Sequence, residues 1–102
     1  MFGIVLDDAD LDRAVEGAIA AKYRNAGQTC VCTNRFYVQA GIHDAFVERL
    51  TEMTAKLTVG DDMEAGVVQG PIINEMQIGK IEELVADAVG KGGRITVGGN
   101  RH

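Results

Sequence analysis

Two cysteines separated by one residue stand in a polar segment, "YRNAGQTCVCTNR", at positions 23–35. Cys30 and Cys32 are the only cysteines of the 102-residue chain, and Arg24 lies six positions before the first of them. Thiols at this spacing suit three kinds of chemistry: metal binding, disulfide formation, or nucleophilic attack by one cysteine beside a companion. A fourth interpretation is that they only pack, because cysteine is among the most often buried residue types.

Metal binding fits this cysteine pair poorly. A structural zinc site requires four ligands, and Cys-x-Cys supplies at most two. The two histidines, His43 and His102, are not spaced as a ligand pair. A thioredoxin-like site has two residues between its cysteines, and no local signature of a Cys–His protease is present. We therefore predict no metal site and no redox centre of the thioredoxin kind.

Several features favour Cys30 as a nucleophile. The segment is polar and joins a predicted helix to a predicted strand, and such loops carry many functional sites. Gly27 permits backbone conformations that other residues resist. A short helical turn from residue 30 onward would direct free N–H groups at the sulfur and stabilise a thiolate, and Arg24 would add positive charge nearby.

Alternating strands and helices surround this segment. Apolar β-branched runs predict strands and apolar stripes of helical spacing predict helices, with a glycine-rich loop at 58–72. The predicted strands are 2–6, 35–39 and 94–99, and the predicted helices are 7–24, about 42–57, and one between the capping residue Asn74 and Gly90. The order β-α-β-α-α-β predicts an α/β fold with three parallel strands. Because parallel sheets are normally covered on both faces, we expect residues 1–102 to be part of a larger domain.

The composition restricts the possible partners. Hydrophobic residues make up 46% of the chain and charged residues 25%, as in folded globular proteins. The formal net charge is −5 and no basic stripe offsets it, so we expect no nucleic-acid partner. No apolar run approaches the roughly 18 residues of a membrane span, and the first residues are not a signal peptide. We therefore expect a cytoplasmic chain without a membrane partner, in a compartment that keeps thiols reduced.

The string "YRNAGQTC" resembles the active-site segment of the aldehyde dehydrogenase superfamily, with Asn25, Gly27 and Gln28 ahead of the nucleophile Cys30. Three more strings resemble this family in the right order: "FGIVLDDADLDRAV", "NRFYVQAGIHDAFVERL" and "VGDDMEAGVVQGPIIN". Arg24 together with the Cys30–Val31–Cys32 triplet is most similar to succinate-semialdehyde dehydrogenases.

The resemblance implies that the Cys30 thiolate attacks an aldehyde, succinic semialdehyde in this subgroup, and that its backbone N–H donates to the oxyanion. A thioester remains after hydride transfer to NAD or NADP, and water hydrolyses it. The resemblance also implies that Arg24 binds the far carboxylate of the substrate, whereas from the residues alone Arg24 is equally a solvated cation at a helix end.

The family's general base, oxyanion asparagine and nucleotide-binding domain have no counterpart in these residues. The resemblance therefore implies that the chain is a partial catalytic domain that needs the rest of the enzyme. We expect it to be inactive alone, to bind no cofactor alone, and to belong to a homo-oligomer in its full-length form.

Cys32 has two interpretations of equal weight. It is either a redox partner that forms a strained, easily reduced disulfide with Cys30, or a residue that packs against the sheet. A different class of function also stays open at this point, in which the chain is a small non-catalytic α/β module for redox sensing or protein interaction that works through Cys30 and Cys32.

Overall fold

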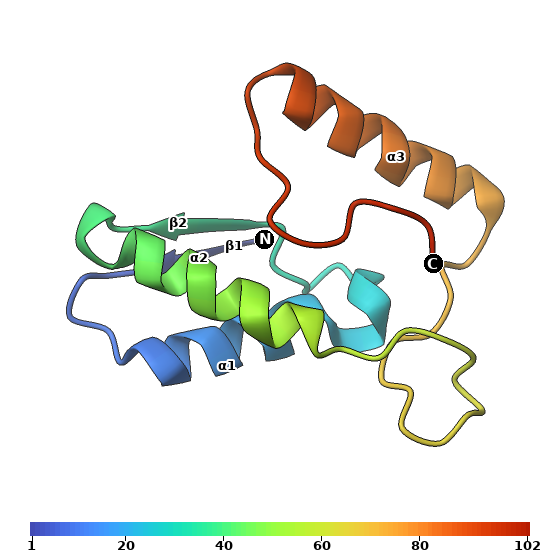
Figure 1. Ribbon diagram of the computed structural model, residues 1–102, viewed down its shortest axis with the longest axis horizontal. Helices are drawn as coiled ribbons and strands as arrows, with labels where there is room; N and C mark the ends of the chain where they lie inside the picture. The colour runs from blue at the N-terminus through green and yellow to red at the C-terminus, as the bar shows by residue number, and fades with distance from the viewer. The chain divides into compact units, whose positions relative to one another are not determined.

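The computed structural model describes residues 1–102, which divide into two compact units, Met1–Leu57 and Thr58–His102. The elements of the first unit are β1 (Phe2–Val5), α1 (Leu11–Lys22), the short 3-10 segment η1 (Arg24–Gly27), β2 (Arg35–Val38) and α2 (Ala40–Ala55). The second unit contains the helix α3 (Glu75–Gly90) (Figure 1). None of these helices combines the length and the apolar character that crossing a membrane requires.

The two strands of the first unit form a parallel sheet (Figure 1). Phe2 lies opposite Arg35, and Val5 lies opposite Val38. The predicted parallel pairing of these segments is confirmed, with each strand one residue shorter than predicted. Beyond the last pair, the amide of Gln39 donates to the carbonyl oxygen of Val5 at 2.9 Å, which ties the start of α2 to the end of β1.

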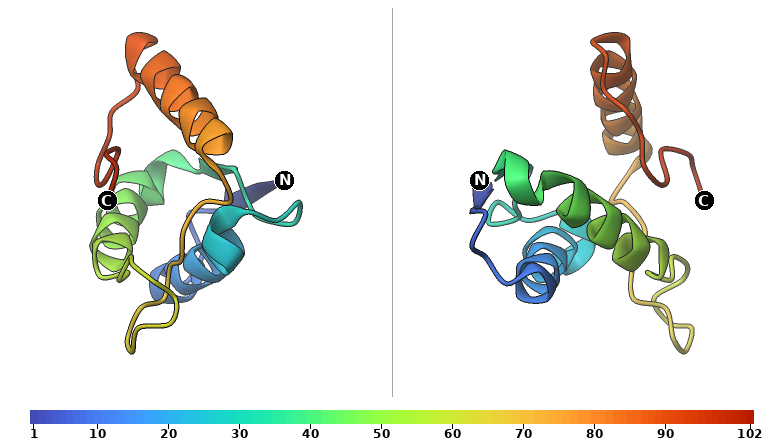
Figure 2. Two further views of the ribbon diagram at one scale, coloured as in Figure 1. Left: turned by 90° about the vertical axis from the view of Figure 1, so that its right-hand side faces the viewer. Right: turned by 60° about the vertical axis from the view of Figure 1, so that its left-hand side comes forward.

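Helices α1 and α2 lie side by side in the first unit and provide most of its core (Figure 2). Residues three and four apart on a helix share a face, so the apolar stripe of each helix turns inward as the sequence predicts. The ring of Phe46 on α2 packs against Phe36 on β2, with ring centroids 6.1 Å apart. The buried apolar cluster consists of Val5, Val15, Ala18, Ile42 and Phe46.

The helix α1 starts four residues later than predicted. Of the three aspartates ahead of it, Asp10 is the cap: its Oδ1 accepts a hydrogen bond from the amide of Arg13 at 3.0 Å. A turn in which the amide of Ala9 donates to the carbonyl oxygen of Leu6 at 3.0 Å precedes this cap. The residues between β1 and α1 therefore form a tight connection instead of a first helical turn.

The second unit contains the predicted loop and the predicted third helix. Residues 58–73 form a loop with one parallel bridge between Val59 and Gln69. The side chain of Asn74 caps α3 by accepting a hydrogen bond from the amide of Gln77 at 2.9 Å. The helix ends at Gly90, as its sequence indicates.

The prediction of a third strand at residues 94–99 is wrong, because this segment forms no strand. Gly98 and Gly99 have φ angles of 72° and 83°, which lie in the left-handed region and interrupt an extended chain. The β-branched residues Ile95 and Val97 favour a strand only where a neighbouring strand pairs with them. The observed fold is therefore an α/β arrangement of two parallel strands and three helices.

Candidate active site

The connection between α1 and β2 carries all three residues singled out from the sequence. It consists of η1 followed by a turn, in which the amide of Cys32 donates to the carbonyl oxygen of Thr29 at 3.2 Å. The amide of Asn34 donates to the carbonyl oxygen of Met1 at 3.0 Å, so the connection lies at the end of the sheet where both strands begin. Ligand sites of open α/β sheets more commonly lie at the opposite, carboxyl end.

Cys30 is exposed at this turn. Where the sequence predicts a short helical turn from residue 30 onward, the structure has a single hydrogen-bonded turn between Thr29 and Cys32, and no helix follows it. The sulfur of Cys30 makes no hydrogen bond within the chain, and neither does its backbone N–H. Both the sulfur, which the sequence predicts to be the nucleophile, and a potential oxyanion donor of the same residue are therefore open to a ligand.

Cys32 has the opposite environment, two positions further along. It is 1% exposed, and its sulfur lies 2.9 Å from the Oγ1 of Thr29 and 3.5 Å from the carbonyl oxygen of Arg24. Both cysteines are free thiols. The burial of Cys32 agrees with the packing interpretation, and a redox pairing with Cys30 stays a prediction that requires Cys32 to leave these contacts.

A left-handed run of backbone separates the helix from the cysteines. Asn25 has φ 49° and ψ 44°, Ala26 has φ 53° and ψ 32°, and Gly27 has φ 76°. Glycine suits position 27 best for two reasons. Residues with a side chain rarely adopt this φ angle, and a methyl group there would lie 3.3 Å from the carbonyl oxygen of Lys22. Left-handed geometry costs a residue with a side chain about 1–2 kcal/mol. Asn25 and Gly27 tolerate this geometry, so the strain falls on Ala26, which the surroundings of the run must hold in place.

Arg24 stands at the start of this run, with an exposed side chain. Its guanidinium takes part in none of the salt bridges of the chain, so its charge is available to an external anion. Its carbonyl oxygen accepts the hydrogen bond from Cys32. The structure thus links Arg24 directly to Cys32, whereas no hydrogen bond connects either residue to the thiol of Cys30.

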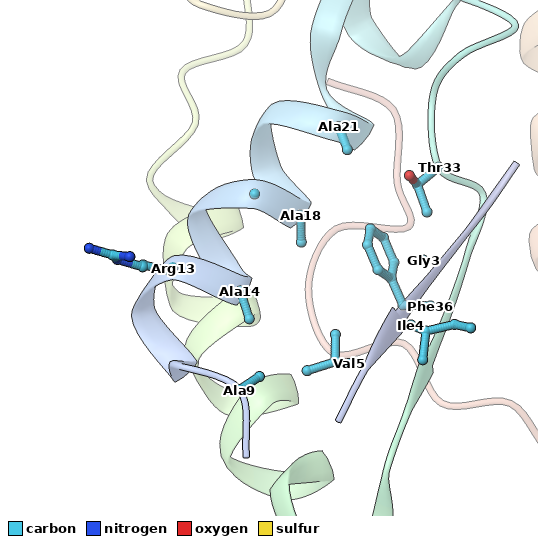
Figure 3. Close-up of a pocket in the computed structure, with 11 residues that line it drawn as sticks. Gly3, Ile4, Val5, Ala9, Arg13, Ala14, Ala18, Ala21, Thr33 and Phe36 are labelled. Carbon is cyan, nitrogen blue, oxygen red and sulfur yellow. The ribbon is translucent and has the colours of Figure 1, made fainter. Parts of the chain in front are cut away.

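A shallow apolar groove of about 260 Å³ lies elsewhere in the first unit, between α1 and the sheet (Figure 3). Ala14, Ala18 and Ala21 line the helical side, facing Val5 and Phe36 (Figure 3). The side chain of Arg13, also on α1, extends away from these residues (Figure 3). The lining contains no cysteine, histidine or carboxylate, and so the groove offers no catalytic chemistry.

The chain contains no group of three or more His, Cys, Asp and Glu side chains placed to hold a metal ion. Two strands lead directly into a long helix: Asp7, Asp8 and Asp10 lie between β1 and α1, and Gln39 alone lies between β2 and α2. Dinucleotide phosphates bind where a glycine-rich turn opens a helix, whereas three carboxylates precede α1 and a single glutamine precedes α2. These residues therefore do not fit the phosphates of NAD or NADP.

Sequence reasoning missed Thr29 and the left-handed turn. The turn has a partial signal, because Asn25 and Gly27 are of the types that most readily adopt left-handed geometry. Ala26 between them hides that signal. Thr29 has a weaker one: it stands three positions before Cys32, the separation that a single turn brings together.

Comparison with known proteins places this segment in context. The model of the aldehyde dehydrogenase family matches residues 2–102. The chain is 57% identical over 99 residues to the succinate-semialdehyde dehydrogenase [NADP(+)] of Escherichia coli strain K12. It is 58% identical over 99 residues to the glutarate-semialdehyde dehydrogenase of Pseudomonas aeruginosa, and 57% identical over 99 residues to the 3-sulfolactaldehyde dehydrogenase of Pseudomonas putida.

Each of these matches covers 97% of this chain and 20% of the relative. The crystal structure of the succinate-semialdehyde dehydrogenase from Burkholderia pseudomallei matches with a TM-score of 0.94 at 52% identity. That match covers 99% of this chain and 21% of the other. The chain therefore spans about a fifth of the length of the relatives that it resembles.

Proposed function

This chain belongs to the aldehyde dehydrogenase family, and from this premise we propose that it supplies the nucleophile, Cys30, of an NAD(P)-dependent enzyme. The proposed reaction is the oxidation of a small aldehyde with an anionic group at its far end. The observation that carries the proposal is the exposed thiol and free amide of Cys30 on a strained turn, within a segment that is similar to semialdehyde dehydrogenases.

The chemistry of a thiol suits this reaction. The Cys30 thiolate attacks the aldehyde carbon and forms a C–S bond, and the carbonyl oxygen becomes an oxyanion that the Cys30 N–H can stabilise. A nicotinamide cofactor, held by other parts of the enzyme, supplies the acceptor for the hydride that leaves this carbon. The remaining thioester reacts with water to give the carboxylic acid and the free thiol.

The names of the relatives support an anionic substrate. Succinate semialdehyde and glutarate semialdehyde carry a carboxylate opposite the aldehyde, and 3-sulfolactaldehyde carries a sulfonate. Arg24 is exposed and unpaired near the turn of Cys30, and its planar guanidinium suits a bidentate pair with either anion. We propose Arg24 as the anchor for this group, and succinic semialdehyde as the substrate.

The test is Arg24→Ala in the complete enzyme. We expect kcat/KM for succinic semialdehyde to fall more than tenfold, about 2 kcal/mol, because the substrate carboxylate loses its partner. Butanal, which has the same chain length and no charge, should lose much less. The substitution keeps the carbonyl oxygen of residue 24, so the hydrogen bond from Cys32 survives.

Two further variants sharpen this test. Arg13→Ala removes the same charge from an exposed position on α1 and should leave the preference for the anionic aldehyde intact. Arg24→Lys keeps the charge without the planar fork and should fall between the parent and Arg24→Ala. Equal losses on both aldehydes with Arg24→Ala would contradict an anchoring role. The parent's kcat/KM values for succinic semialdehyde, glutaric semialdehyde and 3-sulfolactaldehyde decide between these substrates. Succinic semialdehyde should have the highest value.

A further inference from the structure

We propose that Cys32 is a positioning residue, whose buried thiol fastens the backbone of Arg24 to Thr29 and so holds the anchoring arginine in place relative to Cys30. The inference rests on the proposed function, because it takes Arg24 as the anchor and Cys30 as the nucleophile. It gives Cys32 a task that needs no oxidation and that hydrophobic packing alone does not provide.

The geometry defines a short chain of hydrogen bonds. A thiol has one hydrogen to donate and a sulfur that can accept. The sulfur of Cys32 donates to the carbonyl oxygen of Arg24 at 3.5 Å, and so the hydroxyl of Thr29, 2.9 Å away, is the donor in the other contact. One side chain, 1% exposed, therefore bridges the backbone of Arg24 and the side chain of Thr29, which stand five residues apart.

These two positions flank the left-handed run at residues 25–27. Side-chain-bearing residues in left-handed geometry persist only where their surroundings hold them, and two of these three residues carry a side chain. At the end of the run, the amide of Gln28 donates to the carbonyl oxygen of Asn25 at 3.0 Å. The Cys32 thiol adds a contact from outside the run, joining the residue before it to a residue after it.

A cysteine that only packs would be surrounded by apolar groups. The apolar cluster of this unit is built around Val5, Val15 and Phe46 and does not include Cys32. The sulfur of Cys32 makes two polar contacts, to a hydroxyl and to a carbonyl oxygen, which packing alone does not require. A disulfide with Cys30 would withdraw the sulfur from both contacts, so oxidation would loosen the anchor as well as consume the nucleophile.

The experiment uses four variants of the complete enzyme. Cys32→Ala removes both hydrogen bonds, and Thr29→Val removes one without changing the shape of the side chain. Cys32→Ser keeps a donor and an acceptor but cannot form a disulfide, so it separates hydrogen bonding from redox chemistry. Thr51→Val is the matched control, because it removes a hydroxyl that donates to the carbonyl oxygen of Val47 at 2.7 Å within α2.

Two measurements avoid any need for turnover. The first is the succinate concentration that halves the rate at which iodoacetamide alkylates Cys30, with the alkylated residue identified by peptide mass spectrometry. The second is amide hydrogen exchange across residues 24–32. We expect Cys32→Ala and Thr29→Val to raise the protecting succinate concentration about threefold or more, because a buried hydrogen bond is lost. Amide hydrogen exchange across residues 24–32 should become faster in both variants. Cys32→Ser and Thr51→Val should stay within about twofold of the parent.

If Cys32→Ala and Thr29→Val change neither the protection of Cys30 by succinate nor the amide hydrogen exchange, the proposal is overturned and Cys32 is a packing residue. The same loss in Cys32→Ser as in Cys32→Ala would overturn it too, because the hydrogen bonds would then not be the cause. If Cys32→Ala does not fold, Thr29→Val decides the matter. If succinate fails to protect the parent, the anchoring role of Arg24 is wrong, and the exchange rates alone show whether the thiol holds the turn.

Discussion

In the unit Met1–Leu57, Val15 of α1 and Phe46 of α2 are 1% and 2% exposed, whereas in the unit Thr58–His102 Leu84 of α3 is 57% exposed. All three helices carry an apolar stripe of helical spacing. Within their own unit, α1 and α2 pack against each other and against the sheet, whereas the unit of α3 contains no second helix and no sheet. The same sequence pattern therefore yields a core in one unit and a half-exposed helix in the other.

This difference explains why the candidate site belongs to the first unit. Most helical stability in proteins comes from packing an apolar face, and α1 and α2 have that support. The helix α3 depends more on its Asn74 cap and on exposed ion pairs, which contribute little. A strained turn requires rigid surroundings, and the core beside α1 and β2 provides them.

The largest expected effect concerns catalysis by the 102-residue chain alone. The strand–helix connections of the first unit do not fit the phosphates of a nicotinamide cofactor, and removing one member of a catalytic unit costs orders of magnitude. We expect no NADH or NADPH from succinic semialdehyde, while iodoacetamide still labels Cys30. Turnover at ordinary enzyme rates, about 1–1000 per second, would show that the first unit is catalytically sufficient.

The next effect concerns the core itself, compared across the two units in the 102-residue chain. Phe46→Ala should lower the free energy of unfolding by about 3–5 kcal/mol, because it opens a cavity beneath the sheet. Leu84→Ala should change it by no more than about 0.5 kcal/mol, since that side chain is half exposed. Urea denaturation followed by circular dichroism measures both. A comparable loss in the two variants would mean that α3 is packed as tightly as α2.

The smallest effect concerns acid and the second unit. A hydrogen bond from Arg101, 2.6 Å from Nε to Oε1, lowers the pKa of Glu82. A carboxyl whose pKa is depressed on folding stabilises the fold above its unfolded pKa, about 4.3, and this stabilisation is lost as the pH falls through the folded value. The protection of residues 91–102 against hydrogen exchange, taken relative to the intrinsic exchange rate at each pH, should therefore fall in acid, with no matching change in α1.

A substitution cycle isolates this pair. Glu82→Gln should remove the acid response that the parent shows, with a small effect because both side chains are exposed. In a variant that already carries Arg101→Gln, adding Glu82→Gln should cause no further change in the acid response. A response that survives in Glu82→Gln but disappears in the double variant would come from Glu75, whose carboxylate also pairs with Arg101 at 2.7 Å.

The sequence by itself determined the types of the elements and the family. Periodicity indicated all three helices, β-branched runs indicated the two strands that pair, and Asn74 and Gly90 marked the ends of α3. These are local properties, since side-chain spacing and capping depend on residues within a turn or two. The active-site string identified the family because its order of residue types is specific, and the family match confirms it.

Tertiary structure decided what depends on distant partners. The string "RITVGG" has the composition of a strand but no neighbour to pair with, and its glycines turn left-handed. Three aspartates, Asp7, Asp8 and Asp10, precede α1, and the path of the chain after β1 makes Asp10 the cap. The sequence favoured Cys30 as the nucleophile but left Cys32 open between redox pairing and packing, and the turn after α1 exposes Cys30 and buries Cys32 against Thr29. Burial and hydrogen bonding across a turn depend on where the chain is held, which the residue types alone do not specify.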